Sequence, residues 1–141
     1  MTLIGALKES PANLTAASKF TSACGLVYLA SGAVLLLWPA AVQKLLLDPA
    51  FVGNEATLTR LLGMTVAVIG WLYIFGGRSG GRQVVAASIL DRIVLVPLVL
   101  IPAAVNGVFP HTLLMFAVLD PALALVAWRL LSRDGSRHAR S

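Results

Sequence analysis

The chain has 141 residues, of which 58% are hydrophobic and only 12% are charged, with a formal net charge of +5. A soluble domain carries about a quarter of its residues as charged side chains, so this composition excludes an ordinary soluble domain. The apolar residues fall into four long blocks, and each is close to the roughly 20 residues that a helix needs to cross a bilayer. The sequence therefore predicts an all-α polytopic membrane protein, an antiparallel bundle of four transmembrane helices.

The basic residues lie between or beside the apolar blocks and are not interleaved with aromatic residues, so they indicate membrane topology and not nucleic-acid binding. The single cysteine, Cys24, lies inside an apolar block, which rules out an internal disulfide and a cysteine-based metal site. His111 and His138 fall in a predicted turn and in the C-terminal tail. No metal or other cofactor is therefore expected.

Residues 1–17 form a short lead, expected on the cytoplasmic side, and residues 18–131 form a single four-helix domain. Residues 132–141 are basic, small and polar, which predicts a disordered cytoplasmic tail. The first span is predicted at 20–38, where small residues at a spacing of three to four form one helix face. After Pro39, residues 40–51 are typical of a short amphipathic segment on the membrane surface.

The second span is predicted at 57–76. Its internal face is expected to carry Arg60, Gly63, Ala67, Gly70, Ile74 and Gly77. Glycines in both of the first two spans recur seven residues apart, a spacing that keeps one small-residue seam facing a partner helix. The first two helices are therefore predicted to be close antiparallel neighbours.

The third span is predicted at 84–105, with kinks at Pro97 and Pro102, because proline removes a helix hydrogen bond. A tight turn at Asn106-Gly107 leads to the fourth span, at 112–131. There Ala117, Asp120, Ala124 and Ala127 share a face that is expected to point inward.

Four spans bring most basic residues to one side of the membrane, with Lys44 and Arg60 on the other. The rule that cytoplasmic loops are richer in lysine and arginine then places both termini in the cytoplasm. The basic residues on the cytoplasmic side are Lys8, Lys19, Arg78, Arg82, Arg129, Arg133, Arg137 and Arg140.

Asp91, Arg92 and Asp120 are ionisable residues deep within predicted spans. Each costs about 2.5–3.5 kcal/mol at a helix centre on insertion scales, so all three are expected to face the bundle interior and to find partners. The predicted arrangement pairs Arg92 with Asp120, adds Ser88 as a further hydrogen-bond partner of Arg92, and leaves Asp91 as a protonated acid. The candidate catalytic residues are thus Asp91, Asp120 and Arg92.

Three more polar residues are candidates for a structural or cavity role: Arg60 at a cavity mouth, Ser88 beside Arg92, and Asn106 near the outer face. The alternative for the buried charges is purely structural. An Arg–Asp pair can fix helix register, and a protonated Asp can bond a carbonyl freed by proline.

Two short stretches, Gly-Leu-Val-Tyr at 25–28 and Ser-Ile-Leu-Asp-Arg at 88–92, together with the four-span layout over residues 20–131, resemble small DoxX-like and BphX-like bacterial membrane proteins. The resemblance implies a four-helix bundle found beside oxidative or degradative pathways. Small multidrug transporters also have four helices, but they carry a glutamate in the first helix, and the first span here has no charge.

Three functional hypotheses remain open. The first is a non-enzymatic bundle in the lipid membrane that binds a lipophilic small molecule or a membrane protein partner, as an accessory subunit or a homo-oligomer. The second is a membrane enzyme, an isomerase or cyclase acting on a terpenoid or sterol-like substrate, with an aspartate as proton donor. The third is a small proton-coupled transporter that uses an aspartate as carrier.

Overall fold

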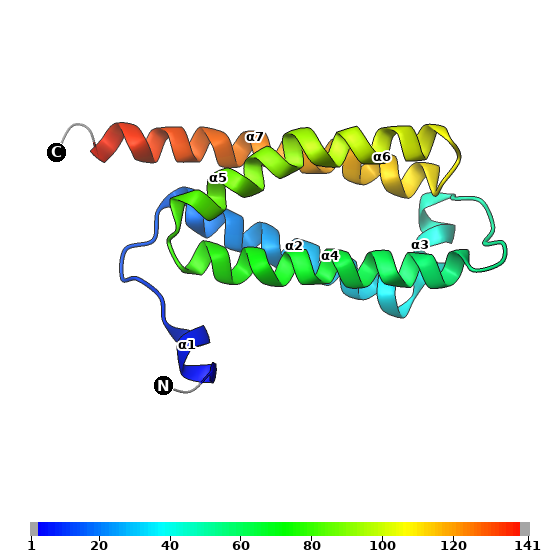
Figure 1. The fold of residues 1–141 in the computed structure, drawn as a ribbon, viewed down its shortest axis with the longest axis horizontal. Coiled ribbons are helices and arrows are strands. Elements are labelled where there is room, and N and C mark those ends of the chain that lie inside the picture. Colours follow the sequence, from blue (N-terminus) through cyan, green and yellow to red (C-terminus); the bar gives the residue numbers. More distant parts are fainter. Residues whose placement is uncertain (1–2, 139–141) are drawn as a thin grey trace.

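The computed structural model describes residues 3–138, and all regular secondary structure in this range is helical. Four helical stretches are long and apolar enough to cross a membrane, so the predicted fold class is confirmed. Two of them, α2 and α4, form one layer, and the other two form a second layer on top of it (Figure 1). The spans are Ala16–Leu37, Glu55–Arg78, Arg82–Val105 and Pro110–Asp134.

The spans correspond to named helices. The first and second are α2 (Ala16–Leu37) and α4 (Glu55–Arg78). The third consists of α5 (Arg82–Leu90), the π-helical turn η1 (Asp91–Leu95) and α6 (Val96–Val105), and the fourth is α7 (Pro110–His138). Two short helices lie outside the spans, α1 (Leu3–Lys8) and α3 (Pro39–Leu46). The start of α2 and the end of α7 lie at one end of the bundle, and α3 lies at the other (Figure 1).

Helices α2 and α4 pack closely along the glycine faces that the sequence predicted. Gly25 lies against Gly70, and Gly32 lies against Gly63. A Cβ atom added at Gly32 would lie 2.4 Å from the backbone nitrogen of Ala67, so the two backbones leave no room for a side chain there. The prediction of a close antiparallel pair is confirmed, because small residues allow this approach in a membrane bundle.

The third span is interrupted by η1, in which the N–H of Val96 donates to the carbonyl of Asp91 five residues earlier. This turn comes directly before Pro97, which has no N–H and whose ring clashes with the carbonyl of Ile93 in a regular α-helix. The irregularity expected at Pro97 therefore takes the form of a π turn, a feature often found at functional sites. After α6, Gly107 adopts φ 84° and the chain reverses into α7.

The inward face of α7 is also as predicted, since Ala117, Asp120, Ala124 and Ala127 are all buried. Its C-terminal part differs from the expectation. The helix continues to His138, where a disordered tail had been predicted from 132 onward, and residues 139–141 lie outside the described residues. One physical reason is that Asp134 is buried and accepts the backbone N–H of Ala17 at 3.1 Å, which joins the end of α7 to the free start of α2.

The opposite end of the bundle is held by Asp48, in the loop after α3. Its carboxylate accepts the backbone N–H groups of His111 at 2.8 Å and Thr112 at 3.1 Å, and also the Thr112 hydroxyl. These N–H groups belong to the first turn of α7, where no helical carbonyl is available to them. Leu47 turns the chain with φ 59°, a left-handed backbone that a non-glycine residue seldom adopts.

Candidate functional site

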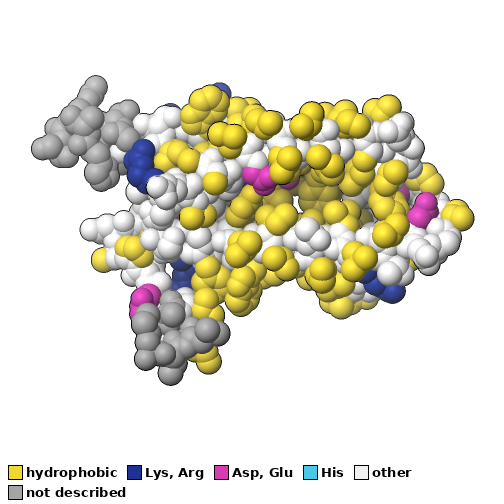
Figure 2. Space-filling view, in the orientation of Figure 1, with side chains coloured by type: hydrophobic (Ala, Val, Ile, Leu, Met, Phe, Trp, Pro, Cys, Tyr) yellow, Lys and Arg dark blue, Asp and Glu magenta, His cyan; other side chains and the backbone are white. Residues whose placement is uncertain are grey.

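The candidate site is a cavity of about 260 Å³ between the two layers of the bundle. Helix α4 packs on α2 and meets α5 near the turn at 79–81, whereas α6 packs on α7, so α4 and α6 diverge from that turn (Figure 1). Figure 2 shows a hollow between these layers, lined by hydrophobic side chains and with acidic atoms at one end. We call it the acidic cavity. It is lined by Tyr28, Leu62, Thr65, Val66, Ile69, Tyr73, Asp91, Leu95, Val96, Val99, Leu100, Leu113, Phe116 and Asp120.

The mouth of the acidic cavity lies on the outer surface of the bundle, between α4 and the third span. Thr65 on α4 and Leu95 and Val99 on the third span line the cavity and are also exposed on the outside of the bundle. The cavity therefore opens sideways, between two spans.

Two tyrosine–aspartate pairs form the polar end of the acidic cavity. The Tyr28 hydroxyl on α2 donates a hydrogen bond to Asp120 Oδ1 on α7. The Tyr73 hydroxyl on α4 donates to Asp91 Oδ2 at 3.3 Å, at the first residue of η1. The two rings meet edge to face with centroids 5.6 Å apart, so all four spans contribute to one polar cluster.

Arg92 lies behind this cluster and does not line the cavity. Its side chain is only 1% exposed, and its guanidinium donates to the Ser88 carbonyl at 3.0 Å and the Ser88 hydroxyl at 3.1 Å. The guanidinium also lies 5.1 Å from the centroid of the Tyr73 ring. One nitrogen, Nη1, is buried without a hydrogen-bond partner among the described residues.

The expected hydrogen bond from Arg92 to Ser88 is formed, but the predicted ion pair between Arg92 and Asp120 is not. Asp120 is bonded to Tyr28 instead, and Arg92 acts on it only through space. The physical reason is that Arg92 folds back along its own helix to Ser88, one turn earlier, so its head stays on the third span.

Two other predicted cavity residues lie elsewhere. Arg60 is exposed on α4, and Asn106 is exposed in the turn between α6 and α7, so neither lines the acidic cavity. The two tyrosines, in contrast, were not predicted as site residues. A signal was available, because a tyrosine inside a span needs a hydrogen-bond partner for its hydroxyl.

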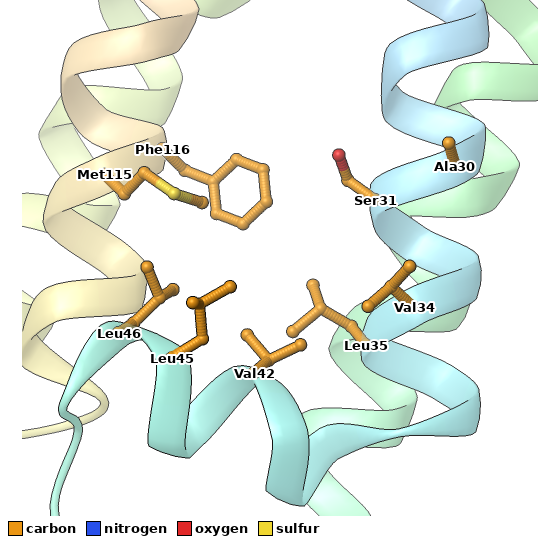
Figure 3. A pocket seen from close by; sticks show the side chains of 9 residues that line it. All are labelled: Ala30, Ser31, Val34, Leu35, Val42, Leu45, Leu46, Met115 and Phe116. Carbon is orange, nitrogen blue, oxygen red and sulfur yellow. The ribbon is translucent and has the colours of Figure 1, made fainter.

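A second pocket, of about 320 Å³, lies between α2, α3 and α7 (Figure 3). We call it the side groove. Its floor is formed by Val42, Leu45 and Leu46 of α3, and its walls by apolar residues of α2 and α7 with the Ser31 hydroxyl. The Phe116 ring points into the side groove, and Phe116 also lines the acidic cavity. Phe116 is therefore the residue that the two linings share.

Among residues 3–138, no group of three or more His, Cys, Asp or Glu side chains is placed to hold a metal ion. The chemistry that the side chains of the acidic cavity offer is hydrogen bonding and proton exchange at two carboxyl groups inside an apolar wall. Comparison of the chain with protein-family models, with curated proteins and with solved structures returned no match.

Proposed function

We propose that this membrane protein binds a small lipophilic molecule, which enters the acidic cavity from the bilayer and places its polar group against Asp91 and Asp120. The observation that carries the proposal is the joining of two features in one cavity. The wall is apolar and reaches the lipid-facing surface, and the inner end carries two carboxyl groups and two tyrosine hydroxyls. Ligand pockets commonly combine an apolar wall with a few convergent polar groups.

The volume supports a small ligand. An engineered apolar cavity of about 150 Å³ holds benzene, and the acidic cavity measures about 260 Å³. An apolar body of several carbons with one polar group therefore fits. Placing two carboxyl groups inside a membrane bundle is costly, and such groups generally mark ligand or proton sites.

The test compares two tryptophan substitutions at adjacent positions on α4. Thr65→Trp fills the mouth of the acidic cavity, whereas Met64→Trp places the same bulk on the exposed helix surface outside it. Each protein is gently extracted from its host membrane and analysed by native mass spectrometry. We expect the unchanged protein and Met64→Trp to retain a defined lipophile, one per chain, and Thr65→Trp to lose it. Equal retention by the two variants would refute the proposal.

An enzyme is the second candidate, because Asp91 is only half-buried and faces the cavity from a π turn. A carboxyl group in that place can give a proton to a bound terpenoid-like substrate. The substitutions Asp91→Asn and Asp120→Asn, made separately, test this role. An enzyme loses far more turnover than ligand retention while the protein level stays normal, whereas a binding protein has no turnover to lose.

For orientation, we propose that both chain termini lie on the cytoplasmic side. The support is the excess of lysine and arginine at the end of the bundle that holds the start of α2 and the turn at 79–81, since Lys44 and Arg60 are the basic residues of the other end. A reporter enzyme that is active only outside the cytoplasm, fused to the C-terminus, should be inactive. An active fusion would reverse the assignment.

A further inference from the structure

We infer that the ligand of the acidic cavity is a lipophilic amine, bound as its ammonium ion with the nitrogen at Asp91. The inference rests on the proposed function and adds the chemical class of the ligand. It follows from which hydrogen-bonding groups of the wall remain free, from the balance of charge around the cavity, and from the different surroundings of the two carboxyl groups.

The polar end of the acidic cavity presents acceptors. Each tyrosine hydroxyl has one proton to donate, and both protons are used on aspartates, Tyr28 on Asp120 and Tyr73 on Asp91. An ionised carboxylate has about four lone-pair sites and no donor. Each aspartate therefore keeps acceptor capacity after the tyrosine bond, and the tyrosine oxygens keep only lone pairs.

The remaining polar groups near the cavity do not add a free hydrogen-bond donor to its wall. Thr65 can donate, but its hydroxyl bonds the Leu61 carbonyl of its own helix. The unpaired donor of Arg92, Nη1, is sealed in the protein interior and does not line the cavity. A ketone or ether, which only accepts hydrogen bonds, thus finds no free donor while both carboxyl groups are ionised. An ammonium group offers three donors and no acceptor, so it complements the hydrogen-bond acceptors of the cavity wall.

The charge balance points the same way. The titratable and charged groups that surround the polar end are Cys24 and Tyr28 on α2, Tyr73 on α4, Asp91 and Arg92 on η1, and Asp120 on α7. Among these, Arg92 is the cation, and it can balance one carboxylate. The second carboxyl group must hold a proton or meet a cation from the ligand, because an uncompensated charge in such surroundings is very costly.

Asp91 is the better partner for the ligand. Asp120 is 5% exposed and its carboxyl group is bonded to Tyr28, whereas Asp91 is half-buried and its bond to Tyr73 is long, at 3.3 Å. Asp91 also begins η1, and its own carbonyl receives the Val96 N–H, so its backbone is fixed while its carboxyl group faces the cavity.

The experiment uses three probes with the same eight-carbon body: octylamine, octan-1-ol and octan-2-one. Binding to the full chain in lipid nanodiscs is measured by native mass spectrometry, with Thr65→Trp as the background for probe that only dissolves in lipid. We expect octylamine to bind most tightly and octan-2-one most weakly, with a gap of about tenfold or more, the size of one charge-assisted hydrogen bond. Asp91→Asn should remove the advantage of the amine and leave octan-1-ol binding nearly unchanged.

The outcomes separate the two levels of the argument. If octan-1-ol or octan-2-one binds as tightly as octylamine and Thr65→Trp removes that binding, the cavity is a binding site but the amine assignment is wrong. If no probe binds above the Thr65→Trp background, both the amine assignment and the proposed function fail. The ranking of the three probes on the unchanged protein tests the amine assignment even where Asp91→Asn does not accumulate.

Discussion

The contact between α2 and α4 allows a quantitative prediction for the substitution Gly32→Ala. The added Cβ would lie 2.4 Å from the backbone nitrogen of Ala67 and 2.6 Å from the carbonyl oxygen of Gly63, whereas ordinary contacts of a Cβ begin at 3.4 Å. Both neighbours are backbone atoms, so no side-chain rotation relieves the overlap. The two helices must separate by about 1 Å, and overpacking of this kind costs about 1–3 kcal/mol.

Alanine recovers part of this cost, because its helix propensity exceeds that of glycine by about 1 kcal/mol. We therefore expect Gly32→Ala to lower the free energy of unfolding by up to about 2 kcal/mol. The double variant Gly32→Ala with Gly70→Ala should lose less free energy of unfolding than the two single variants lose together, since one separation of the helices relieves both overlaps.

The assay is reversible unfolding in mixed micelles, followed by circular dichroism, and the control is Gly76→Ala. Gly76 lies on the same helix as Gly70, but an added Cβ there meets only the side chain of Val84. Gly76→Ala should therefore be the more stable variant. If Gly32→Ala is as stable as Gly76→Ala, the close approach of the two backbones does not hold the pair together, and the reasoning is refuted.

Two further predictions concern Asp48 and Phe116. Asp48→Ala removes the acceptor for two free N–H groups at the start of α7, so we expect a loss of about 0.5–2 kcal/mol in the same unfolding assay; Lys44→Ala, an exposed change nearby, is the control, and equal stability of the two would contradict this role. Phe116→Ala should join the acidic cavity to the side groove. Probes with longer chains, such as dodecylamine, should then gain affinity relative to octylamine in the nanodisc assay, and an unchanged ratio would show that the two spaces stay separate.

The features that depend on the pattern along one helix could be predicted from the sequence. The four apolar blocks, the glycine seam of the first two helices and the inward face around Asp120 each follow from the periodicity of a single segment. The bond from Arg92 to Ser88 belongs to the same class, because residues four apart on a helix are neighbours whatever lies around them.

The features that depend on the rotation of one helix against another could not be predicted from the sequence. The ion pair predicted between Arg92 and Asp120 was plausible from depth alone, but the tyrosines that take up both aspartates come from α2 and α4. Which donor reaches which acid is set by packing to within an ångström or two. The same is true of Asp48, whose partners at the start of α7 lie 63 and 64 residues away along the chain.

The π turn at Asp91–Leu95 has a consequence for how this gene can vary. Such a turn holds one residue more than an α-helical turn at the same height, and each helical residue accounts for about 100° of rotation. Deleting one residue within 93–95 would therefore let the third span become a regular helix, while Ser88 and Arg92 before the deletion and Val96 and Leu100 after it keep their neighbours. Deleting one residue from the regular helix on either side, in α5 or α6, would instead swing one part of the span by about 100° against the other. A single-codon deletion within the π turn should thus be better tolerated than one in α5 or α6, which deep mutational scanning with deletions would measure.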